Sequence, residues 1–278
     1  MLLVKWQNEL SWSIKVSGSK NAALPILWAA LLLNGRVTIN RVPRIWDVMT
    51  FLDILEGIWV KYEWEGSTLH FDSSNITNKN LNFEKIKKIR SSIFLLSPLL
   101  HFFGNIKIPF PGWCSIWARP IDAHLNGLEA IWYNSNFDND EISLGWKLKT
   151  WLKELNASFW VSSTENLIVA NVLRDGKTII RNAATEPHVM NLIDFLRKAW
   201  ADIKIRYNHE IIITWVYGLR SNFTFDVVAD YIESGTYMVI WALASKEYID
   251  IVDARIDDLY TYIEKLKEAW VKVQDMWN

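Results

Sequence analysis

Residues 17–43 read SGSKNAALPILWAALLLNGRVTINRVP, and this stretch decides the fold. A cap rich in serine and glycine opens it, and the residues after the cap are apolar on all sides, which is typical of an apolar helix. The turn NG follows, and RVTIN then alternates polar and apolar residues with the period of a half-buried strand. The stretch therefore predicts a helix that turns directly into a strand.

Four copies of this pattern follow one another along the 278 residues, at intervals of about seventy. A cap followed by an apolar helix is expected within residues 17–33, 89–103, 162–173 and 233–244. Alternating strands are expected after them, over residues 35–43, 104–112, 176–184 and 246–254. A second, amphipathic helix that runs into another strand is expected in each copy, over residues 51–64, 124–136, 192–206 and 262–275. The sequence thus predicts βαβ units in tandem.

Tryptophan is unusually frequent, with 17 residues against 11 glycines, whereas glycine normally makes up roughly 7% of a protein. Trp59, Trp132, Trp200 and Trp270 hold the same place after the second helix of each copy, at spacings of 73, 68 and 70. The chain usually enters the left-handed backbone region there, which suits glycine and costs other residues roughly 1–2 kcal/mol. Tryptophan is a poor choice for such a position.

Other tryptophans also occupy turns or the residue before a strand, among them Trp12, Trp113, Trp117 and Trp215. Our hypothesis is that many of these residues are glycine in the native protein, which would follow if a genome reading UGA as glycine were translated with tryptophan at UGA. The alternative is an aromatic-rich core or binding surface, whose residues would follow helix or strand periodicity instead of turns. Tryptophan masses in peptides of the native protein would exclude the hypothesis.

The charge balance argues against two classes of partner. Thirty basic and 31 acidic side chains leave a net charge of −1, so nucleic acid and anionic membranes are not expected to bind.

The longest apolar run, Ala22–Leu33, contains Pro25 and falls short of the ~20 residues that span a bilayer. Residues 1–12 lack the pattern of a signal peptide, and a single cysteine fits a reducing compartment. We expect an intracellular, cytoplasmic protein.

The single cysteine, Cys114, lies in the segment PGWCSIWARP, residues 111–120. A lone cysteine is more often a small buried hydrophobe than a reactive group. If the two tryptophans of the segment are glycines, however, the loop is flexible and polar, and Arg119 lies five residues away. Such surroundings lower the pKa of a thiol and make it reactive. We therefore interpret Cys114 as a chemical group.

Three further residues stand at expected helix starts. Lys20 and Asn21 open the first apolar helix, and Arg90 precedes the second, which begins with two serines. A helix start with an adjacent cation forms an anion site, although a solvated lysine beside a cap is the commoner meaning of such a pair. The histidines show no ligand spacing, so no metal is expected; they are His70, His101, His124, His188 and His209.

Six segments in order resemble the enolpyruvyl transferases, in particular those that act on UDP-N-acetylglucosamine: SGSKNAALPIL, KIRSSIFLLSPL, PGWCSIWARPIDAHLNGLE, SSTENLIVANVL, RNAATEPHVMNLIDFL and DYIESGTYMV. The resemblance implies an α/β fold of tandem βαβαββ repeats, which form a two-domain, inverse α/β barrel-like structure. Residues 20–227 would form a first domain of three repeats. Residues 1–19 and 228–278 would form one repeat of an incomplete second domain.

The resemblance also implies roles for individual residues. Cys114 would be the general acid that protonates the methylene carbon of phosphoenolpyruvate, and the thiol that an epoxide antibiotic alkylates. Phosphoenolpyruvate would bind Lys20 and Asn21. UDP-N-acetylglucosamine would bind a set of residues before and after the cysteine, with Val161 and Ser162 as additional contacts: Arg90, Arg119, Pro120, Ile121, Asp122 and Ala123. No cofactor or metal is implied.

The implied activity is transfer of the enolpyruvyl group to the 3′-hydroxyl of UDP-N-acetylglucosamine by a monomer with two small-molecule substrates, the first committed step of peptidoglycan synthesis. The family's aspartate base is expected in two further repeats that have no counterpart in these residues. Tyr231 and Ser158 also replace an arginine and a lysine of the family pattern. Three alternatives stay open: a 3-phosphoshikimate 1-carboxyvinyltransferase, a catalytically incomplete nucleotide-sugar-binding fragment, and a pseudogene product that neither binds nor reacts.

Overall fold

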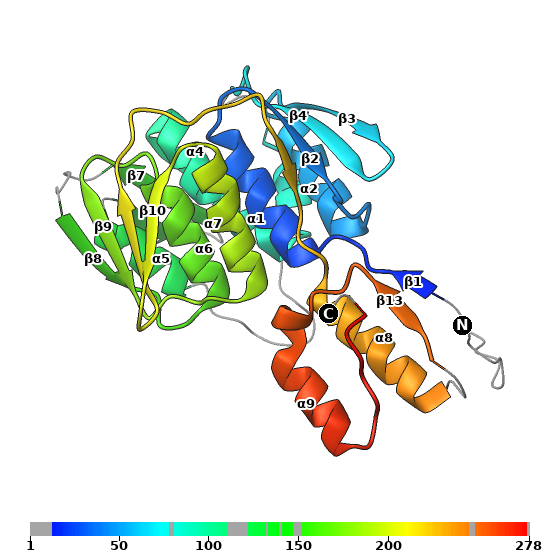
Figure 1. Ribbon diagram of the computed structural model, residues 1–278. Helices are drawn as coiled ribbons and strands as arrows, with labels where there is room; N and C mark the ends of the chain where they lie inside the picture. The colour runs from blue at the N-terminus through cyan, green and yellow to red at the C-terminus, as the bar shows by residue number, and fades with distance from the viewer. Residues whose placement is uncertain are drawn as a thin grey trace. The chain divides into compact units, whose positions relative to one another are not determined.

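The computed structural model describes residues 13–77, 81–109, 122–131, 133–138, 141–146, 152–244 and 248–276 (Figure 1). The chain divides into two compact units, and each is described by itself. One unit comprises residues 20–227. The other comprises residues 1–19 and 228–278.

Apolar helices form the centre of unit 20–227. They are α1 (Lys20–Leu31), α4 (Leu96–Phe103) with the 3₁₀ turn η1 (Arg90–Leu95) before it, and α6 (Val161–Asn171). Ala22 to Leu31 of α1 are buried without interruption, as expected for a helix that is apolar on all sides. Ser163 to Asn171 of α6 are buried as well, although about half of these residues are polar. The three expected helices of this unit are confirmed, and α1 packs against α4, α6 and α7.

The second helix of each repeat buries only one face. These helices are α2 (Trp46–Glu56), α5 (Asp122–Ile131) and α7 (Pro187–Lys198), and a short helix α3 (Phe83–Ile86) precedes η1. In α7, for example, Val189, Leu192 and Leu196 are buried whereas Asp194 is exposed. This is the amphipathic pattern that the sequence predicts. Figure 1 shows the helices running side by side between strands β2, β3 and β4 on one side and β8, β9 and β10 on the other.

Three sheets belong to this unit among the described residues, in the orders β12-β2-β4-β3, β5-β7-β6 and β10-β11-β9-β8. The strands are β2 (Arg36–Asn40), β3 (Lys61–Glu65), β4 (Thr68–Asp72), β5 (Asn105–Pro109), β6 (Tyr133–Asp138), β7 (Glu141–Trp146), β8 (Leu152–Asn156), β9 (Lys177–Arg181), β10 (Asp202–Arg206), β11 (Glu210–Thr214) and β12 (Thr224–Asp226). Both strands expected in each of the three repeats are present. Each repeat also forms an antiparallel hairpin: β3–β4, β6–β7 or β10–β11.

The last strand of this unit returns to the first repeat. β12 pairs in parallel with β2, so that Thr224 lies opposite Thr38 and Phe225 lies opposite Ile39. Phe225 is buried and contacts the Phe195 ring of α7 with a centroid separation of 5.3 Å. The first sheet is therefore completed by residues from the far end of the unit.

The smaller unit contains one helix pair and a two-stranded parallel sheet. β1 (Ser13–Lys15) pairs with β13 (Asp250–Val252), and the helices are α8 (Tyr231–Ala244), η2 (Ile256–Leu259) and α9 (Tyr260–Glu268). The prediction of a strand after α9 was wrong, because residues 271–276 form no strand. A strand is stabilised by hydrogen bonds to a neighbour. In the described part of this unit β1 and β13 are the only paired strands, and Gly18 and Ala229 form an isolated antiparallel bridge.

The predicted left-handed positions are confirmed wherever they are described. Trp59, Trp200 and Trp270 have φ angles of 69°, 74° and 65°. Their side chains are 58%, 66% and 94% exposed, so they form no core. Trp132 lies outside the described residues. Trp28 differs from these three, because it is 1% exposed within α1 and its ring stacks on Phe94. The aromatic-core alternative therefore fits Trp28 but not the turn positions.

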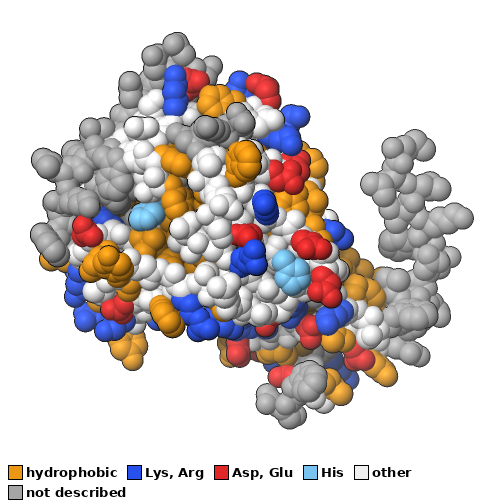
Figure 2. All heavy atoms as spheres, turned by 90° about the horizontal axis from the view of Figure 1, so that it is seen from above, with side chains coloured by type: hydrophobic (Ala, Val, Ile, Leu, Met, Phe, Trp, Pro, Cys, Tyr) orange, Lys and Arg blue, Asp and Glu red, His pale blue; other side chains and the backbone are white. Residues whose placement is uncertain are grey.

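The surface carries charges of both signs. Figure 2 shows Lys and Arg side chains interspersed with Asp and Glu over one face. Among the residues that the structure describes, helices of sufficient length and hydropathy to cross a bilayer are absent.

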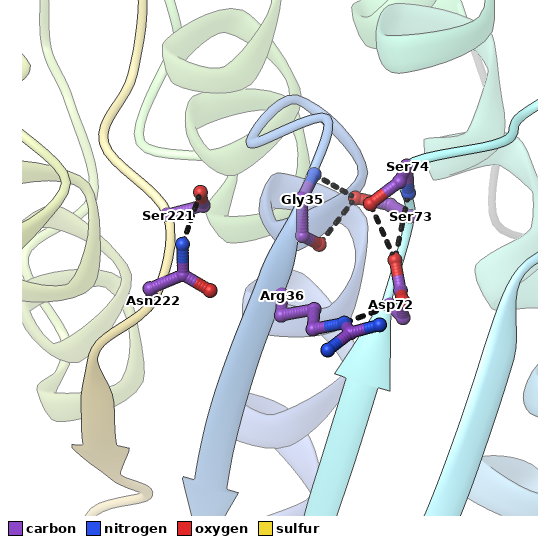
Figure 3. Close-up of polar contacts among 7 residues, drawn as sticks. All are labelled: Gly35, Arg36, Asp72, Ser73, Ser74, Ser221 and Asn222. Carbon is purple, nitrogen blue, oxygen red and sulfur yellow. Dashed lines mark hydrogen bonds and ion pairs between the residues drawn. The ribbon is translucent and has the colours of Figure 1, made fainter.

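Gly35 marks a close approach of two segments in the first repeat (Figure 3). Its backbone N–H donates to Ser73 Oγ at 3.2 Å, and Ser73 Oγ lies 3.1 Å from the carbonyl oxygen of Ala30. A Cβ atom on Gly35 would lie 2.6 Å from both Cβ and Oγ of Ser221. The turn between α1 and β2 therefore has no room for a side chain.

We expect Gly35→Ala to lower the free energy of unfolding by about 1–3 kcal/mol, because the added methyl group overpacks this contact. Chemical denaturation would measure the change. Gly218→Ala is the matched control, since a Cβ atom there meets nothing within 4 Å. Adding Ser221→Gly to the Gly35 variant should restore stability. Equal losses in the Gly35 and Gly218 variants would contradict this account.

Candidate functional site

The structure describes only part of the residue set expected to bind substrate. Cys114, Arg119, Pro120 and Ile121 lie outside the described residues. Asp122 and Ala123 are the first two residues of α5, so this helix begins directly after the cysteine segment.

Close packing holds α5 against α6. Gly127 lies in the middle of α5, and a Cβ atom there would be 2.8 Å from Cδ2 of Leu167 in α6. The absence of a side chain at Gly127 allows the two helices to approach closely. At their N-terminal ends, His124 Nε2 lies 3.0 Å from Ser162 Oγ. The structure thus brings residues 122–124 and 161–162 together from two repeats.

A buried row of polar side chains continues inward from this contact. His124 Nδ1 lies 3.1 Å from Asn166 Nδ2, and the Ser97 hydroxyl donates to Asn166 Oδ1. His124, Asn166 and Ser97 are each 3% exposed or less. The imidazole also contacts the Phe94 ring edge-on, with centroids 5.5 Å apart. Sequence reasoning treated His124 only as part of the loop after Arg119 and did not assign it a partner.

The surroundings keep the His124 imidazole neutral. Burial, and to a smaller extent the positive charge of Arg90, lower the pKa of His124 to about 3. Desolvation disfavours the charged form of a buried base, and a nearby cation acts in the same direction. Arg90 opens η1, so the predicted sugar-nucleotide arginine belongs to the same neighbourhood as His124 and Ser162.

The start of α6 provides backbone donors at this place. Trp160 precedes the helix and makes no side-chain cap, because an indole N–H donates and cannot accept a hydrogen bond. The backbone N–H of Thr164 donates to the carbonyl oxygen of Trp160, and this is the first backbone hydrogen bond of the helix. The dipole of α6 favours an anion at this end of the helix. Val161 and Ser162, expected to contact the nucleotide, are the first two residues of α6.

Lys20 and Asn21 stand at the start of α1, as predicted. The Lys20 ammonium donates to Asp47 Oδ2 at 3.0 Å, and both side chains are partly exposed. A solvent-exposed pair of this kind contributes little net stability. An incoming anion would therefore have to share the Lys20 ammonium with Asp47.

A buried acid lies one residue before Asn166 and was not found from the sequence. Glu165 is 3% exposed, and its pKa is raised well above the usual value by burial and then by the charge of Glu186. Its Oε1 atom is 4.0 Å from His188 Nε2. A carboxyl group whose pKa is raised is neutral over a wide pH range, so this contact is not a strong ion pair. An acidic residue inside an apolar helix was the available signal.

One hollow on this unit lies elsewhere. It has a volume of about 580 Å³ on the polar face of the first sheet, where Arg36 Nε pairs with Asp72 Oδ2 at 2.9 Å (Figure 3). Its lining includes neither Lys20 nor Arg90 nor Ser162. Charges that already neutralise each other offer little to an anionic ligand, so we place the candidate site at the helix starts.

Comparison with known proteins agrees with this architecture. The family model described as EPSP synthase (3-phosphoshikimate 1-carboxyvinyltransferase) matches residues 4–277. The chain belongs to this family. The solved enolpyruvyl transferase NikO from Streptomyces tendae matches with a TM-score of 0.86 at 19% identity, over 96% of this chain and 64% of that one. This likeness confirms the expected enolpyruvyl transferase fold.

Curated members of the family with higher identity share one name. The UDP-N-acetylglucosamine 1-carboxyvinyltransferase of Desulfosudis oleivorans is 35% identical over 98% of this chain and 65% of its own length. The corresponding protein numbered 2 of Carboxydothermus hydrogenoformans is 37% identical over 98% of this chain and 64% of its own length. The chain therefore spans just under two thirds of the length of these relatives.

Proposed function

We propose that this chain binds UDP-N-acetylglucosamine and phosphoenolpyruvate and takes part in enolpyruvyl transfer from the second to the first. Cys114 acts as the general acid, Lys20 and Asn21 bind phosphoenolpyruvate, and Arg90 binds the nucleotide sugar. The residues of the segment Arg119–Ala123 bind the nucleotide. We place this reaction in the cytoplasm, in the synthesis of peptidoglycan.

One observation supports the proposal most directly. The helix that follows the cysteine segment is joined to the start of α6 through His124 Nε2 and Ser162 Oγ, 3.0 Å apart, with the Arg90 charge close by. A cation, the N-terminal end of a helix and a hydroxyl group at one place suit the diphosphate of a sugar nucleotide. The names of the relatives that are 35–37% identical point to the same substrate.

The proposed reaction is an addition followed by an elimination. The thiol of Cys114 gives a proton to the methylene carbon of phosphoenolpyruvate while the 3′-hydroxyl oxygen bonds to the adjacent carbon and loses its proton to a base. Loss of a proton from the former methylene carbon and departure of inorganic phosphate then restore the double bond. Cations and helix starts that hold both anions in register supply much of the rate.

Calorimetry with UDP-N-acetylglucosamine and a phosphate-release assay with both substrates test the proposal. We expect binding, and release of phosphate that falls at least about 100-fold in Cys114→Ala because the general acid is lost. Binding should persist in this variant. As Cys114 is the only cysteine, an epoxide that alkylates thiols should add once to the wild type and not to Cys114→Ala.

Each other outcome has a distinct meaning. Binding without phosphate release would favour a nucleotide-sugar-binding fragment over an enzyme. Release with shikimate 3-phosphate in place of the sugar nucleotide would favour a 3-phosphoshikimate 1-carboxyvinyltransferase. Absence of both binding and phosphate release would contradict the proposal.

A further inference from the structure

The hydrogen-bond row that ends at Ser162 has a fixed direction. The Ser97 hydroxyl donates to Asn166 Oδ1, so the Asn166 amide group directs its Nδ2 hydrogens toward His124. Nδ2 can only donate, and therefore His124 Nδ1 accepts at 3.1 Å. A neutral imidazole with an accepting Nδ1 carries its proton on Nε2.

The same logic fixes the Ser162 hydroxyl group. His124 Nε2 donates to Ser162 Oγ over 3.0 Å, so the hydrogen of that hydroxyl must point away from the imidazole. Thr164, two residues later, donates its hydroxyl to the carbonyl oxygen of Trp160. In the described part of the chain, Ser162 Oγ makes no such bond. Among those described residues nothing accepts its hydrogen, which could therefore be donated to a ligand oxygen.

From this geometry we propose that His124 is a positioning residue that directs the Ser162 hydroxyl to donate to an anionic oxygen of the nucleotide sugar. This inference rests on the proposed function, and it adds a side-chain donor to the backbone donors at the start of α6. Hydrogen bonds in a row polarise one another, so the buried groups behind Ser162 strengthen its bond to the ligand.

The neighbouring charges favour this arrangement. Arg90 lies close enough to His124 to affect its titration, so a second positive charge on the imidazole would be unfavourable. A neutral imidazole can still hold Ser162 in place while Arg90 supplies the positive charge. Among the groups packed around the imidazole, Asn166, Ser97 and Phe94 carry no charge.

Three variants test the inference through the Kd of UDP-N-acetylglucosamine. Ser162→Ala removes the proposed donor and should weaken binding about tenfold, since a hydrogen bond to a charged group is lost. His124→Phe keeps a ring beside Phe94 but loses the proton, and should weaken binding by a similar factor. His124→Gln can accept from Asn166 and donate to Ser162, so it should retain affinity within about threefold.

The double variant Ser162→Ala with His124→Phe separates positioning from a general structural effect. If His124 acts through Ser162, the double variant binds no more weakly than Ser162→Ala alone. Uridine, which has no phosphate, should bind all variants equally in an NMR titration. The inference would be overturned if the affinity losses of the two single variants multiplied in the double variant. It would also be overturned if the variants lost uridine affinity by the same factor as affinity for the nucleotide sugar.

Failure of the inference and failure of the proposed function can be told apart. If Ser162→Ala binds as tightly as the wild type, only the inference is overturned. If the wild type does not bind at all, the proposed function is overturned as well. Nitrogen-15 NMR of the His124 ring gives a readout without ligand. A proton on Nε2 supports the row, and a proton on Nδ1 overturns it. If His124→Phe does not fold, Ser162→Ala still tests the inference, because Ser162 is partly exposed and its replacement is tolerated more easily.

Discussion

Replacing Trp59 and Trp200 together by glycine is expected to raise the free energy of unfolding of unit 20–227 by about 2 kcal/mol. Both residues have left-handed backbone angles, with φ of 69° and 74°, which cost a residue with a Cβ atom about 1–2 kcal/mol. The greater conformational freedom of glycine in the unfolded chain offsets part of this gain in stability. The tryptophans are 58% and 66% exposed, so little apolar burial is lost.

Thermal unfolding would show this gain as a rise of about 4–8 °C in Tm, given a unit of this size. One contact acts in the opposite direction: the Arg220 guanidinium lies 5.4 Å from the Trp200 ring centroid, a contact worth about 0.5–1 kcal/mol when exposed. Trp46→Gly is the matched control, because Trp46 is 61% exposed but begins α2. Glycine in a helix is destabilising by about 0.5–1 kcal/mol, so its Tm should fall.

The same backbone angles bear on the native protein. If UGA is read as glycine in its own cells, peptides of the native chain should carry glycine masses at residues 59, 200 and 270, where φ is positive. The structure does not extend this expectation to Trp28, which is buried against Phe94 within α1. Tryptophan masses at the three turn positions, or stabilities that fall equally in the turn variants and in Trp46→Gly, would contradict the hypothesis.

Lowering the pH from 7.5 to 5 is expected to remove about 2 kcal/mol of stability through His124 alone. Its pKa is about 3 in the folded chain against an ordinary value of 6.5. Between these two values the unfolded chain binds a proton that the folded chain does not, so the free energy of unfolding falls as the pH falls. The loss begins near pH 6.5 and is complete near pH 3.

Glu165 acts in the opposite direction. Its pKa is raised in the folded chain, so the folded state holds a proton that the unfolded state releases above about pH 4.5, and its contribution to stability falls as the pH rises. Burial also lowers the pKa of His101. The measurement is therefore the difference between two chains that share these groups.

Urea denaturation of the wild type and of His124→Gln at a series of pH values would give that difference. The two curves of stability against pH should diverge by about 2 kcal/mol between pH 7.5 and 5, because glutamine does not titrate. Ser97→Ala is the control, since it breaks the far end of the hydrogen-bond row but retains the imidazole. Parallel curves for the wild type and His124→Gln would show that His124 is not the group responsible.

Periodicity in the sequence predicted most of the fold. A helix that is apolar on all sides, such as α1, and alternating strands such as β2 and β9, follow from patterns within one segment. The left-handed turns at Trp59 and Trp200 could be predicted because glycine serves the same place in related turns. The strand expected after α9 was wrong because a local pattern does not show whether a neighbouring strand is available.

The candidate site was predictable only in part. Lys20, Arg90 and Ser162 could be placed at helix starts, since capping patterns are local. The partners of His124 could not, because Ser162 and Asn166 belong to another repeat and meet His124 only after α5 packs on α6 through Gly127. The roles of Cys114 and Arg119 remain predictions from the resemblance.

The parallel pairing of β12 with β2 has a consequence for the order of events during synthesis. Thr38 emerges from the ribosome well before Thr224, its partner across the sheet. At about 5–20 residues per second, the edge of β2 waits roughly ten seconds or more for the strand that covers it. A nascent chain halted before residue 224 would keep this edge open to pairing with other chains, so translational pauses in that interval should promote aggregation.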